Sequence, residues 1–525
     1  MLYLEKFAGS SQSAYITAPW YRPEMKRQTS TRNSPPASRA FSVAGLAGLE
    51  WGSLSGPVAV GRYLLALTKK LRSAAPAFVL IAMASLAVGQ SPSGASLGIA
   101  PGSGGNVVTV KITDPGNYVW LLQSSTNLTN WIEISALKLH NGSFARGIPP
   151  VATPNLSFRA IFDPAQQTIP SALTNALLLP PSPFNYATPI LPTKFLQQPI
   201  LGQDNTPSTN LTTDGGSTLG RVLFYDKRLS TNQTVACASC HVQANGFSDP
   251  RRFSVGFNGG LTGRNSMGLS NARWYQRKKF FWDERAATLE DQTLMPIQNS
   301  VEMGMTLSAL TNRLAAEPFY TNLFTQTFGT PEVTSERISK ALAQFVRSIV
   351  STQSKYDVGV ANGFANFTTQ ENLGRQIFFG QGPSFSHVTC VACHGSDNFV
   401  PGPNINNNGL ENPYVDKGVG ALTGQPQDEG LFKVPSLRNI ELTAPYMHDG
   451  RFATLEQVVE FYDSGVVAHP NLSPPLKATG GAAGSPLRLN LTPTQKAALV
   501  AFMKTLTDTN LATDAKFSDP FNYGN

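Results

Sequence analysis

The first patterned stretch of the chain alternates apolar and polar residues between about residues 100 and 165. Turn-forming segments such as Asp-Pro-Gly-Asn at 114–117 separate the alternating runs. Alternation allows a strand to bury one face and expose the other. We therefore expect a small antiparallel β domain over residues 100–165. Its four clearest runs are VVTVKI, YVWLLQSS, WIEIS and FRAIF.

Prolines are frequent in the next segment, 166–195, which is typical of a linker. Beyond it, apolar residues recur three and four positions apart, most clearly in 335–350 (SERISKALAQFVRSIV) and 493–506 (PTQKAALVAFMKTL). That spacing predicts amphipathic helices. No alternating pattern accompanies them, so the larger part of the chain is predicted to be mainly α.

An apolar run at 74–88 follows a short basic segment that contains Lys69, Lys70 and Arg72. This order is the layout of a secretory signal, which we place at 69–92. The run is short for a membrane span, and an uncleaved N-terminal anchor is the alternative. Residues 1–68 lack a periodic pattern and are interpreted as an extension from an over-extended start. We expect an exported, periplasmic protein.

The net charge of +8 belongs mainly to this N-terminal part. Residues 1–72 hold ten basic and three acidic residues, whereas the remainder holds 31 basic and 30 acidic residues. The body of the protein is therefore close to neutral. It offers no basic groove, so we expect no nucleic-acid partner.

All four cysteines lie in two Cys-x-x-Cys-His motifs. The residues are Cys237, Cys240 and His241 in the first motif, and Cys390, Cys393 and His394 in the second. This spacing is the attachment signature of c-type haem, in which the thiols form thioethers and the histidine is the proximal iron ligand. One such motif alone is also compatible with a zinc half-site or a redox dithiol. Two motifs that use every cysteine favour two covalent haems.

Each motif lies early in its own helical half. We therefore expect two tandem cytochrome c-like haem domains, over residues 196–360 and 361–520. Export agrees with this prediction, because bacterial attachment of c-type haem takes place outside the cytoplasmic membrane.

The sixth iron ligand decides between electron transfer and peroxide chemistry. No histidine lies between His241 and His387, so the loop after the first motif offers no second histidine. The first haem is therefore expected to be open to a small oxidant. His387, three residues before Cys390, is interpreted as a surface or haem-edge residue.

Residues 200–520 resemble the bacterial di-haem cytochrome c peroxidases and the MauG proteins. Two strings carry the resemblance: FFWDERAATLEDQTLMPIQNSVEMG and KVPSLRNIELTAPYMHDGRFATLEQVVEFY. The resemblance implies a periplasmic di-haem enzyme that reduces hydrogen peroxide at the first haem.

The first string implies a peroxide pocket. Glu302 matches the family's distal glutamate, which moves a proton between the two peroxide oxygens. Gln292 matches a glutamine that binds oxygen species, and Trp282 matches the tryptophan between the haems. Pro296 and Met303 match residues that flank the pocket. Taken singly, Trp282 and Met303 could be core residues and Glu302 a helix-start carboxylate, but their mutual spacing favours the functional interpretation.

The second string implies the surroundings of the second haem. His448 matches a histidine beside that haem. Fourteen residues later, where conventional peroxidases carry a methionine ligand, this chain has Tyr462, as MauG does. A tyrosine ligand lowers the haem potential and suits the storage of oxidising equivalents. In the alternative, Tyr462 is a buried helix residue, and Met447 or water is the ligand.

The resemblance also implies one Ca²⁺ between the haem domains. Asn265, Thr443 and Pro445 match its ligands, which are one asparagine side chain and two backbone carbonyls. Oxygen ligands supplemented by water suit this ion.

Two departures from conventional peroxidases, the missing loop histidine and Tyr462, favour the MauG-like branch. The expected partner is a small cytochrome c or cupredoxin electron donor, or a protein substrate oxidised at a distance. Membrane contact is expected only through an uncleaved anchor. The alternatives are a conventional cytochrome c peroxidase, and a di-haem electron carrier or redox sensor without peroxidase turnover.

Overall fold

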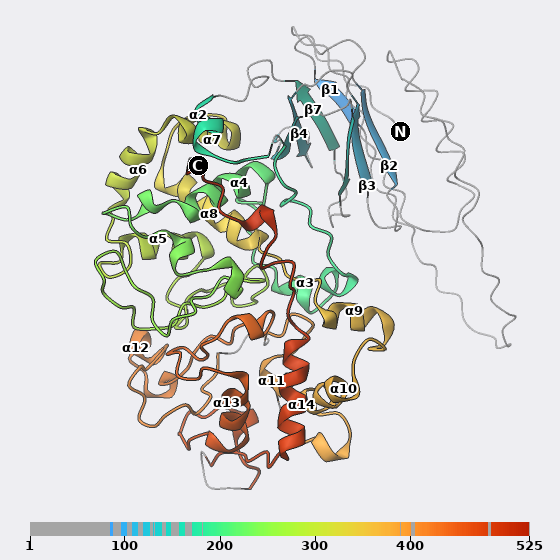
Figure 1. Ribbon diagram of the computed structural model, residues 1–525, viewed down its shortest axis with the longest axis vertical. Helices are drawn as coiled ribbons and strands as arrows, with labels where there is room; N and C mark the ends of the chain where they lie inside the picture. Colours follow the sequence, from blue (N-terminus) through green and yellow to red (C-terminus); the bar gives the residue numbers. More distant parts are fainter. Residues whose placement is uncertain are drawn as a thin grey trace, which may run out of the picture. The chain divides into compact units, whose positions relative to one another are not determined.

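The computed structural model describes the strands between residues 84 and 162, with residue 130, and residues 171–523 except 181, 389, 401–404 and 481–484. The chain divides into two units, 1–168 and 169–525. Figure 1 shows strands in the first unit and helices with long loops in the second. The second unit is helix-rich, as the apolar spacing predicts.

The N-terminal unit contains two sheets. One has the order β1-β7-β4-β5 and the other the order β2-β3-β6. All neighbouring strands are antiparallel except β1 and β7, which are parallel. Strand β1 lies before residues 100–165, the range for which an antiparallel domain was predicted. The bounds are Ala84–Ala87 (β1), Ser96–Pro101 (β2), Val108–Thr113 (β3), Val119–Ser125 (β4), Ile132–Lys138 (β5), Ser143–Ile148 (β6) and Ser157–Phe162 (β7).

Of the predicted signal segment 69–92, only β1 is among the described residues, and the extension 1–68 lies outside them. In the described part of the chain, no helix combines the length and apolarity needed to cross a membrane.

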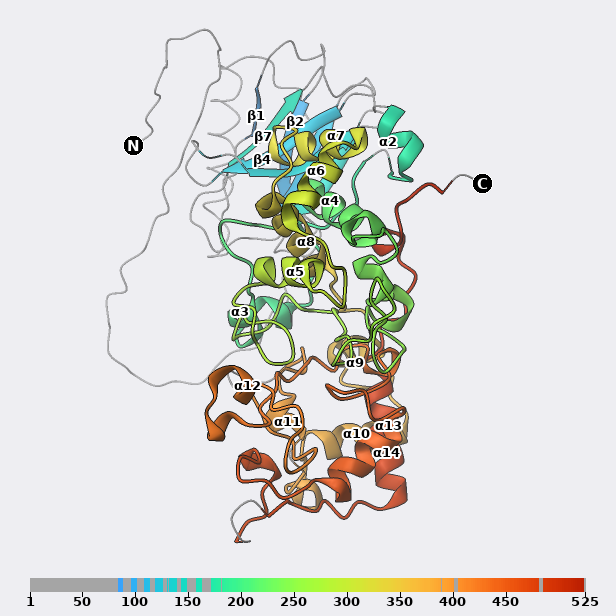
Figure 2. The ribbon, with the colours of Figure 1, turned by 90° about the vertical axis from the view of Figure 1, so that its left-hand side faces the viewer.

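The larger unit has two helical halves. The helices before and around the first haem motif are α2 (Ser171–Ala176), α3 (Ile200–Gln203), α4 (Asp214–Tyr225), α5 (Leu289–Gln298), α6 (Leu307–Ala315), α7 (Pro318–Phe328) and α8 (Ser335–Ser348). Those of the second half are α9 (Lys355–Asn362), α10 (Thr369–Phe378), α11 (Cys390–Cys393), α12 (Gly420–Thr423), α13 (Leu455–Glu460) and α14 (Pro493–Lys504). Figures 1 and 2 place the two halves one above the other.

The two helices predicted from apolar spacing are confirmed as α8 and α14. The side chain of Thr334 accepts a hydrogen bond from the backbone N–H of Arg337 and caps α8. Thr492 and Gln495 form a capping box at α14, whose first residue is Pro493. Caps satisfy N–H groups that have no partner within the helix, and proline suits the first turn because it lacks an N–H group.

Both halves contain the same close crossing of two helices at a glycine. A Cβ atom at Gly220 of α4 would lie 2.0 Å from the carbonyl oxygen of Ala341 on α8. A Cβ atom at Gly374 of α10 would lie 1.9 Å from the carbonyl oxygen of Ala498 on α14. Only glycine permits this approach without a shift of one helix.

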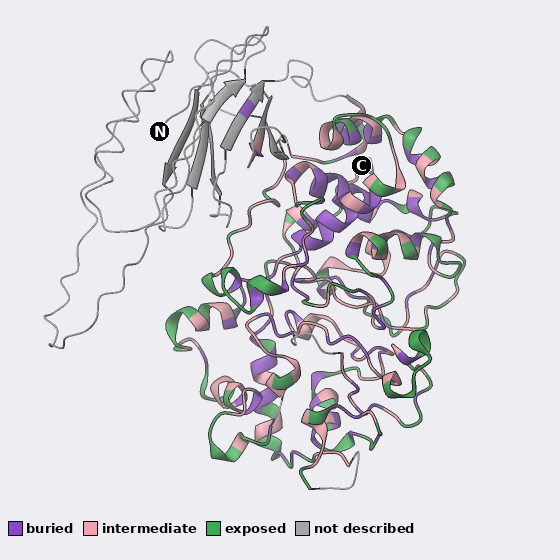
Figure 3. Cartoon of the chain, turned by 180° about the vertical axis from the view of Figure 1, so that it is seen from behind, coloured by how far each residue is buried: buried purple, intermediate pink, exposed green. Residues whose placement is uncertain are grey.

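Three phenylalanines accompany each crossing. In the first half, Phe224 packs against Phe345 at 5.1 Å between ring centroids and against Phe247 at 6.1 Å. In the second half, Phe378 packs against Phe502 at 5.1 Å and against Phe399 at 5.8 Å. The sequence offsets from the glycines are the same, since Phe224 and Phe378 each lie four residues beyond them. The two haem halves are therefore built on one repeated core, which Figure 3 shows as buried residues in both.

The segment after α14 returns to the first half. Leu511 and Phe517 are buried in the core cluster that contains α4 and α8. Arg221 on α4 donates a hydrogen bond to the carbonyl of Ala515. Figures 1 and 2 both show this segment running back towards α4 and α2.

Much of the segment predicted as a linker, 166–195, packs on the same core. Leu173, Leu177 and Tyr186 are buried there. Leu177 also pairs with Phe521 of the returning segment in an isolated bridge. The described part of this segment, 171–195 except 181, is therefore structured, and its first part packs as an edge of the first half.

Candidate active site

The first haem motif lies at the wall of a cavity in the first half. Cys237–Ser239 form one 3₁₀ turn, and His241 follows two residues after its end. Nδ1 of His241 lies 2.9 Å from the carbonyl oxygen of Phe247. Donation from Nδ1 leaves Nε2 as the nitrogen that can bind iron. Burial lowers the pKa of His241, which favours the neutral form that a metal requires.

The second motif repeats this arrangement. Cys390–Cys393 form the single turn α11, and Nδ1 of His394 lies 3.3 Å from the carbonyl oxygen of Phe399. Burial lowers the pKa of His394 to about 4. Burial also raises the pKa of Cys237 and of Cys390 to about 12. Protonated thiols are poor zinc ligands and poor redox nucleophiles, so these sites fit thioether attachment better.

The two motifs face different cavities. The space at His241 spans about 1670 Å³ and the space at Cys390, Cys393 and His394 about 1810 Å³, and each volume includes a part that is open to solvent. Aliphatic and aromatic residues form much of the second wall, including Leu437, Val459 and Met503. A large apolar cavity with a histidine and two cysteines at its wall fits a c-type haem.

The expected peroxide residues Glu302, Gln292 and Pro296 all line the first cavity. Gln292 and Pro296 lie on α5, which Thr288 caps by accepting a hydrogen bond from the backbone N–H of Asp291. Met303 does not share this position. Its side chain is 3% exposed and packs in the core of the first half, so the cavity wall there is formed by its neighbours.

The backbone of Glu302 is fixed from both sides. The side-chain oxygen of Asn299 accepts from the N–H groups of Val301 and Glu302, at 2.8 and 3.1 Å. The carbonyl of Glu302 accepts from the N–H of Phe257 at 3.0 Å. Burial raises the pKa of Glu302, and the positive charge of Arg285 partly opposes this shift. A carboxyl group with a raised pKa is suited to both accepting and donating a proton.

Trp282 lines both cavities. Its indole Nε1 donates to the carbonyl of Asn265 at 2.8 Å, and its own carbonyl accepts from the backbone N–H of Lys433 at 2.8 Å. Lys433 belongs to the second half, so Trp282 is held between the halves. An aromatic ring in this position can pass an electron from one cavity to the other.

His448 lies beside Trp282 in the wall of the second cavity. The two rings are 6.5 Å apart between centroids, and Phe432 stacks on His448 at 3.9 Å. Nε2 of His448 lies 3.8 Å from a carboxylate oxygen of Asp416. The carbonyl of His448 accepts from the backbone N–H of Asn265 at 2.8 Å. His448 therefore connects the wall of the second cavity with the segment that holds Trp282.

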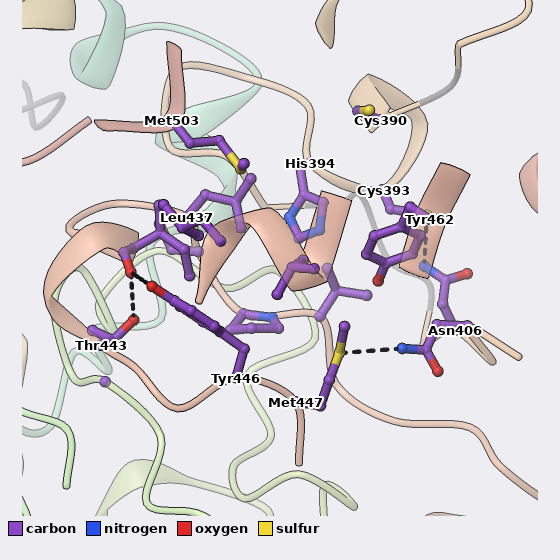
Figure 4. A pocket seen from close by; sticks show the side chains of 18 of the residues that line it. Cys390, Cys393, His394, Asn406, Leu437, Thr443, Tyr446, Met447, Tyr462 and Met503 are labelled. Carbon is purple, nitrogen blue, oxygen red and sulfur yellow. Dashed lines mark hydrogen bonds between the residues drawn. The ribbon is translucent and has the colours of Figure 1, made fainter. Parts of the chain in front are cut away.

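Tyr462 reaches the second cavity from a π-turn. Helix α13 ends at Glu460, and Phe461–Gly465 continue it with π-helical bonds. Single π-turns are frequent at functional sites because they change the direction of the side chains. Figure 4 shows Tyr462, Met447 and His394 around one cavity. Burial raises the pKa of Tyr462, and a hydrogen bond to Asn408 opposes the shift.

Met447, the alternative ligand, shares the partner of Tyr462. The side-chain nitrogen of Asn408 lies 3.5 Å from the sulfur of Met447. The thioether sulfur thus already accepts a weak hydrogen bond, whereas the hydroxyl of Tyr462 lies beside the same amide. Both side chains are in the cavity wall, and the geometry brings together every residue expected at the second haem.

The expected calcium ligands Asn265, Thr443 and Pro445 all line the second cavity. The amide nitrogen of Asn265 donates to the carbonyls of Arg251 and Arg252, at 3.0 and 3.3 Å. Within the described part of the chain, no three His, Cys, Asp or Glu side chains gather into a metal cluster. A cation here would therefore depend on the asparagine oxygen and backbone carbonyls.

The cavities are also lined by charged residues that were not expected from the sequence, among them Arg285 and Lys433. Arg285 lines the first cavity and bonds Asp283 at 3.0 Å, and Lys433 lines both cavities. Each lies inside one of the two sequence strings that resemble the family, but no motif or spacing within the string marked it as a cavity residue. Only their position in the fold distinguishes them from surface charges.

Comparisons with known proteins agree with this geometry. The sequence model of a family described as di-haem cytochrome c peroxidase matches residues 215–363. The methylamine utilization protein MauG of Methylophilus methylotrophus is 31% identical over 300 residues, covering 57% of this chain and 84% of the relative. Cytochrome c551 peroxidase of Nitrosomonas europaea is 38% identical over 247 residues, covering 46% of this chain and 71% of the relative.

One solved structure shows the same fold at a similar level. A MauG-like protein associated with microbial copper homeostasis is 34% identical, with a TM-score of 0.53, and the match covers 62% of this chain and 98% of that protein. Sequence and structure thus match these proteins along most of their own length. The chain belongs to the family of di-haem cytochrome c peroxidases and MauG proteins, and it is a di-haem peroxidase.

Proposed function

We propose that the two halves divide the peroxidase reaction between them, with peroxide handled in the first cavity and oxidising equivalents stored at the second. One observation carries the proposal: Glu302 and Gln292 line only the first cavity, Tyr462 lines only the second, and Trp282 lines both. When bound, the two haems supply iron centres that accept and donate electrons.

In the first cavity, Glu302 takes a proton from hydrogen peroxide and returns it to the departing oxygen. Its fixed backbone and its raised pKa support this role, because a carboxyl group with a raised pKa is better suited to both accepting and donating a proton than an ordinary carboxyl group is. Gln292 donates its amide hydrogen to a bound oxygen atom. His241 is the proximal ligand, oriented by the carbonyl of Phe247.

In the second cavity, His394 and Tyr462 are the residues that would hold the haem iron. A phenolic oxygen is a harder and more electron-donating ligand than a thioether, so it favours the oxidised state. Trp282 passes electrons between the cavities. A Ca²⁺ at Asn265, Thr443 and Pro445 is proposed to hold Asn265 in place. The backbone of Asn265 is hydrogen-bonded to the indole of Trp282 and to the carbonyl of His448.

The proposed location is the periplasm, where c-type haem attachment and the predicted signal at 69–92 would place the protein. The electrons come from a small cytochrome c or cupredoxin, or from a protein substrate oxidised at a distance.

The test is to mix the diferric protein with one equivalent of hydrogen peroxide and to follow the visible and near-infrared spectra for milliseconds to minutes. A rapid change at both haems without added reductant is expected. A response only after reduction would indicate a conventional cytochrome c peroxidase. No response in either state would indicate an electron carrier or redox sensor.

A further inference from the structure

A buried tyrosine in the wall of the first cavity is bonded to a buried carboxylate. Tyr275 is 2% exposed and lines the cavity that contains His241. Its hydroxyl donates a hydrogen bond to the carboxylate of Glu284. Burial and the negative charge of Glu284 both raise the pKa of Tyr275, so the phenol keeps its proton while it is reduced.

Glu284 occupies a strained backbone position to make this contact. Its φ angle is +57°, in the left-handed region that side-chain-bearing residues rarely adopt, and the residue is 7% exposed. Arg277, which is partly exposed, binds the same carboxylate through Nε at 2.8 and 2.7 Å. Strain of this kind persists where the surroundings impose it, and it is concentrated at functional sites.

Other buried tyrosines of the described chain have at most one of these two features, a position in a haem cavity and a carboxylate partner. Tyr320 donates to Asp226 at 2.7 Å and Tyr356 donates to Asp397 at 2.9 Å, but neither lines a haem cavity. The tyrosines of the second cavity, Tyr446 and Tyr462, bond the carbonyl of Ile440 and the amide of Asn408. Among the described tyrosines, Tyr275 alone combines a haem cavity with a carboxylate partner.

Lys433 connects this pair to Trp282. Its backbone N–H bonds the carbonyl of Trp282 at 2.8 Å, and its ammonium nitrogen lies 3.8 Å from the centre of the Tyr275 ring. Burial lowers the pKa of Lys433 to about 7, so its amine is only partly charged near neutral pH. The radical cation of a phenol is a strong acid, so oxidation of Tyr275 releases the phenolic proton together with the electron, and Glu284 is the group in position to accept it.

We propose that Tyr275 is a third redox site of the protein, and that Glu284 is its proton acceptor. Hydrogen peroxide is the oxidant, and it takes up two electrons and two protons to form two water molecules. Tyr275 supplies one of these electrons through the first haem site, the second haem site supplies the other through Trp282, and solvent supplies the two protons. The O–H bond of Tyr275 breaks as its own proton passes to Glu284. The products are a neutral tyrosyl radical and a protonated carboxyl group. An electron from the donor protein restores the phenol, and the proton then returns from Glu284.

The experiment uses the full-length protein with both haems attached. It is mixed with one equivalent of hydrogen peroxide, frozen at intervals from milliseconds to seconds, and examined by electron paramagnetic resonance. The wild-type protein should give a tyrosyl signal that narrows when the protein contains ring-deuterated tyrosine. The signal should be absent from Tyr275→Phe. It should persist in Tyr320→Phe, the matched control, which loses a buried carboxylate-bonded hydroxyl outside both cavities.

Glu284→Gln tests the proton acceptor separately. Glutamine preserves the size of the side chain and can accept a hydrogen bond, but its amide is not basic enough to take up the phenolic proton. Formation of the radical should become slower by roughly a hundredfold, the usual contribution of a positioned proton acceptor. This variant also keeps the test decisive if Tyr275→Phe fails to retain its haems.

Consumption of hydrogen peroxide is measured in the same mixtures. Consumption without a tyrosyl signal, or with a signal that survives in Tyr275→Phe, would overturn this inference and leave the proposed function intact. Unchanged formation of the radical in Glu284→Gln would exclude Glu284 as the acceptor. Absence of peroxide consumption would overturn the division of the reaction between the cavities, on which the inference rests.

Discussion

The carbonyl oxygen of Phe247 lies 2.9 Å from Nδ1 of His241, and Phe247 reaches this position with a φ angle of +61°. The second half repeats the relationship between Phe399, whose φ angle is +54°, and His394. Both phenylalanines are fully buried in the repeated aromatic cores. Packing of the ring therefore imposes an unusual backbone, and that backbone directs the carbonyl at the haem-binding histidine.

Replacement of Glu302 by glutamine should remove the proton transfer in the first cavity. We expect the rate of reaction with hydrogen peroxide to fall by about 10²- to 10⁴-fold. In the wild type, the rate should fall as the pH is lowered through the pKa of Glu302, because the carboxylate is the form that accepts a proton. Burial raises the pKa of Glu302 above the ordinary carboxyl pKa of 4.5, so this fall in rate should begin at a higher pH than for an ordinary carboxylate.

Stopped-flow measurement of the rate between about pH 4 and about pH 8 checks this prediction, because that range begins near the ordinary pKa of a carboxyl group and ends above neutrality. Glu336→Gln is the control, because this carboxylate is exposed on α8 and bonds only Lys340. A wild-type rate in Glu302→Gln would exclude Glu302 as the acid–base residue.

Exchange of Tyr462 for methionine should raise the potential of the second haem, because a thioether stabilises reduced iron better than a phenolic oxygen does. Spectroelectrochemical titration measures the effect. Tyr446→Phe is a matched control, since this tyrosine lines the same cavity but bonds the carbonyl of Ile440. If Tyr462→Phe leaves the spectrum unchanged and Met447→Leu alters it, the methionine is the ligand.

Trp282→Phe should slow the response of the second haem to peroxide while the reaction in the first cavity continues. The indole ring lies in both walls, and phenylalanine is much harder to oxidise. Rapid-mixing spectra that separate the two haems check this. Trp274→Phe serves as the comparison, because Trp274 lines the first cavity only. Equal slowing in both variants would argue against a specific role of Trp282.

Gly220→Ala should destabilise the first half. Alanine favours a helix over glycine by about 1 kcal/mol, but its Cβ would lie 2.0 Å from the carbonyl oxygen of Ala341. Overpacking of this kind costs about 1–3 kcal/mol, and here it involves backbone rather than a flexible side chain. Thermal unfolding should show a lower midpoint. Gly263→Ala, where no atom lies within 4 Å of the new Cβ, should remain close to wild type.

Removal of calcium with a chelator should lower the thermal stability and slow electron transfer between the haems, with both haems still attached. A cation that binds only the folded protein stabilises it in proportion to its occupancy. Metal analysis and unfolding at several calcium concentrations measure this. Asn265→Ala should abolish the calcium response, whereas Asn258→Ala, at an exposed position, should retain it. No bound calcium in the purified wild type would refute the site.

Local patterns predicted those parts of the protein that depend on neighbouring residues. The two haem motifs are contiguous in sequence, and α8 and α14 follow from apolar spacing within single segments. Glu302, Gln292 and Trp282 could be proposed only through resemblance to a family, because no local pattern says that they share a cavity.

Features that depend on distant segments could not be predicted. The bond from Arg221 to the carbonyl of Ala515 joins residues almost 300 positions apart, and no periodicity reports it. The pairing of Tyr275 with Glu284 depends on a left-handed backbone that glutamate rarely adopts, so its sequence gave no indication of a turn. Met303 was expected to flank the pocket from the family resemblance alone, but its side chain packs in the core, because adjacent residues can face opposite sides.

The return of the segment around Phe517 to the first core has a consequence for biosynthesis. Ribosomes make a chain from its N-terminus, so the first motif is synthesised long before the residues that close its core. The core of the first half can therefore be completed only after the whole second half has been synthesised, when Leu511 and Phe517 become available to pack. Until then, Cys237 and Cys240 belong to an incomplete fold.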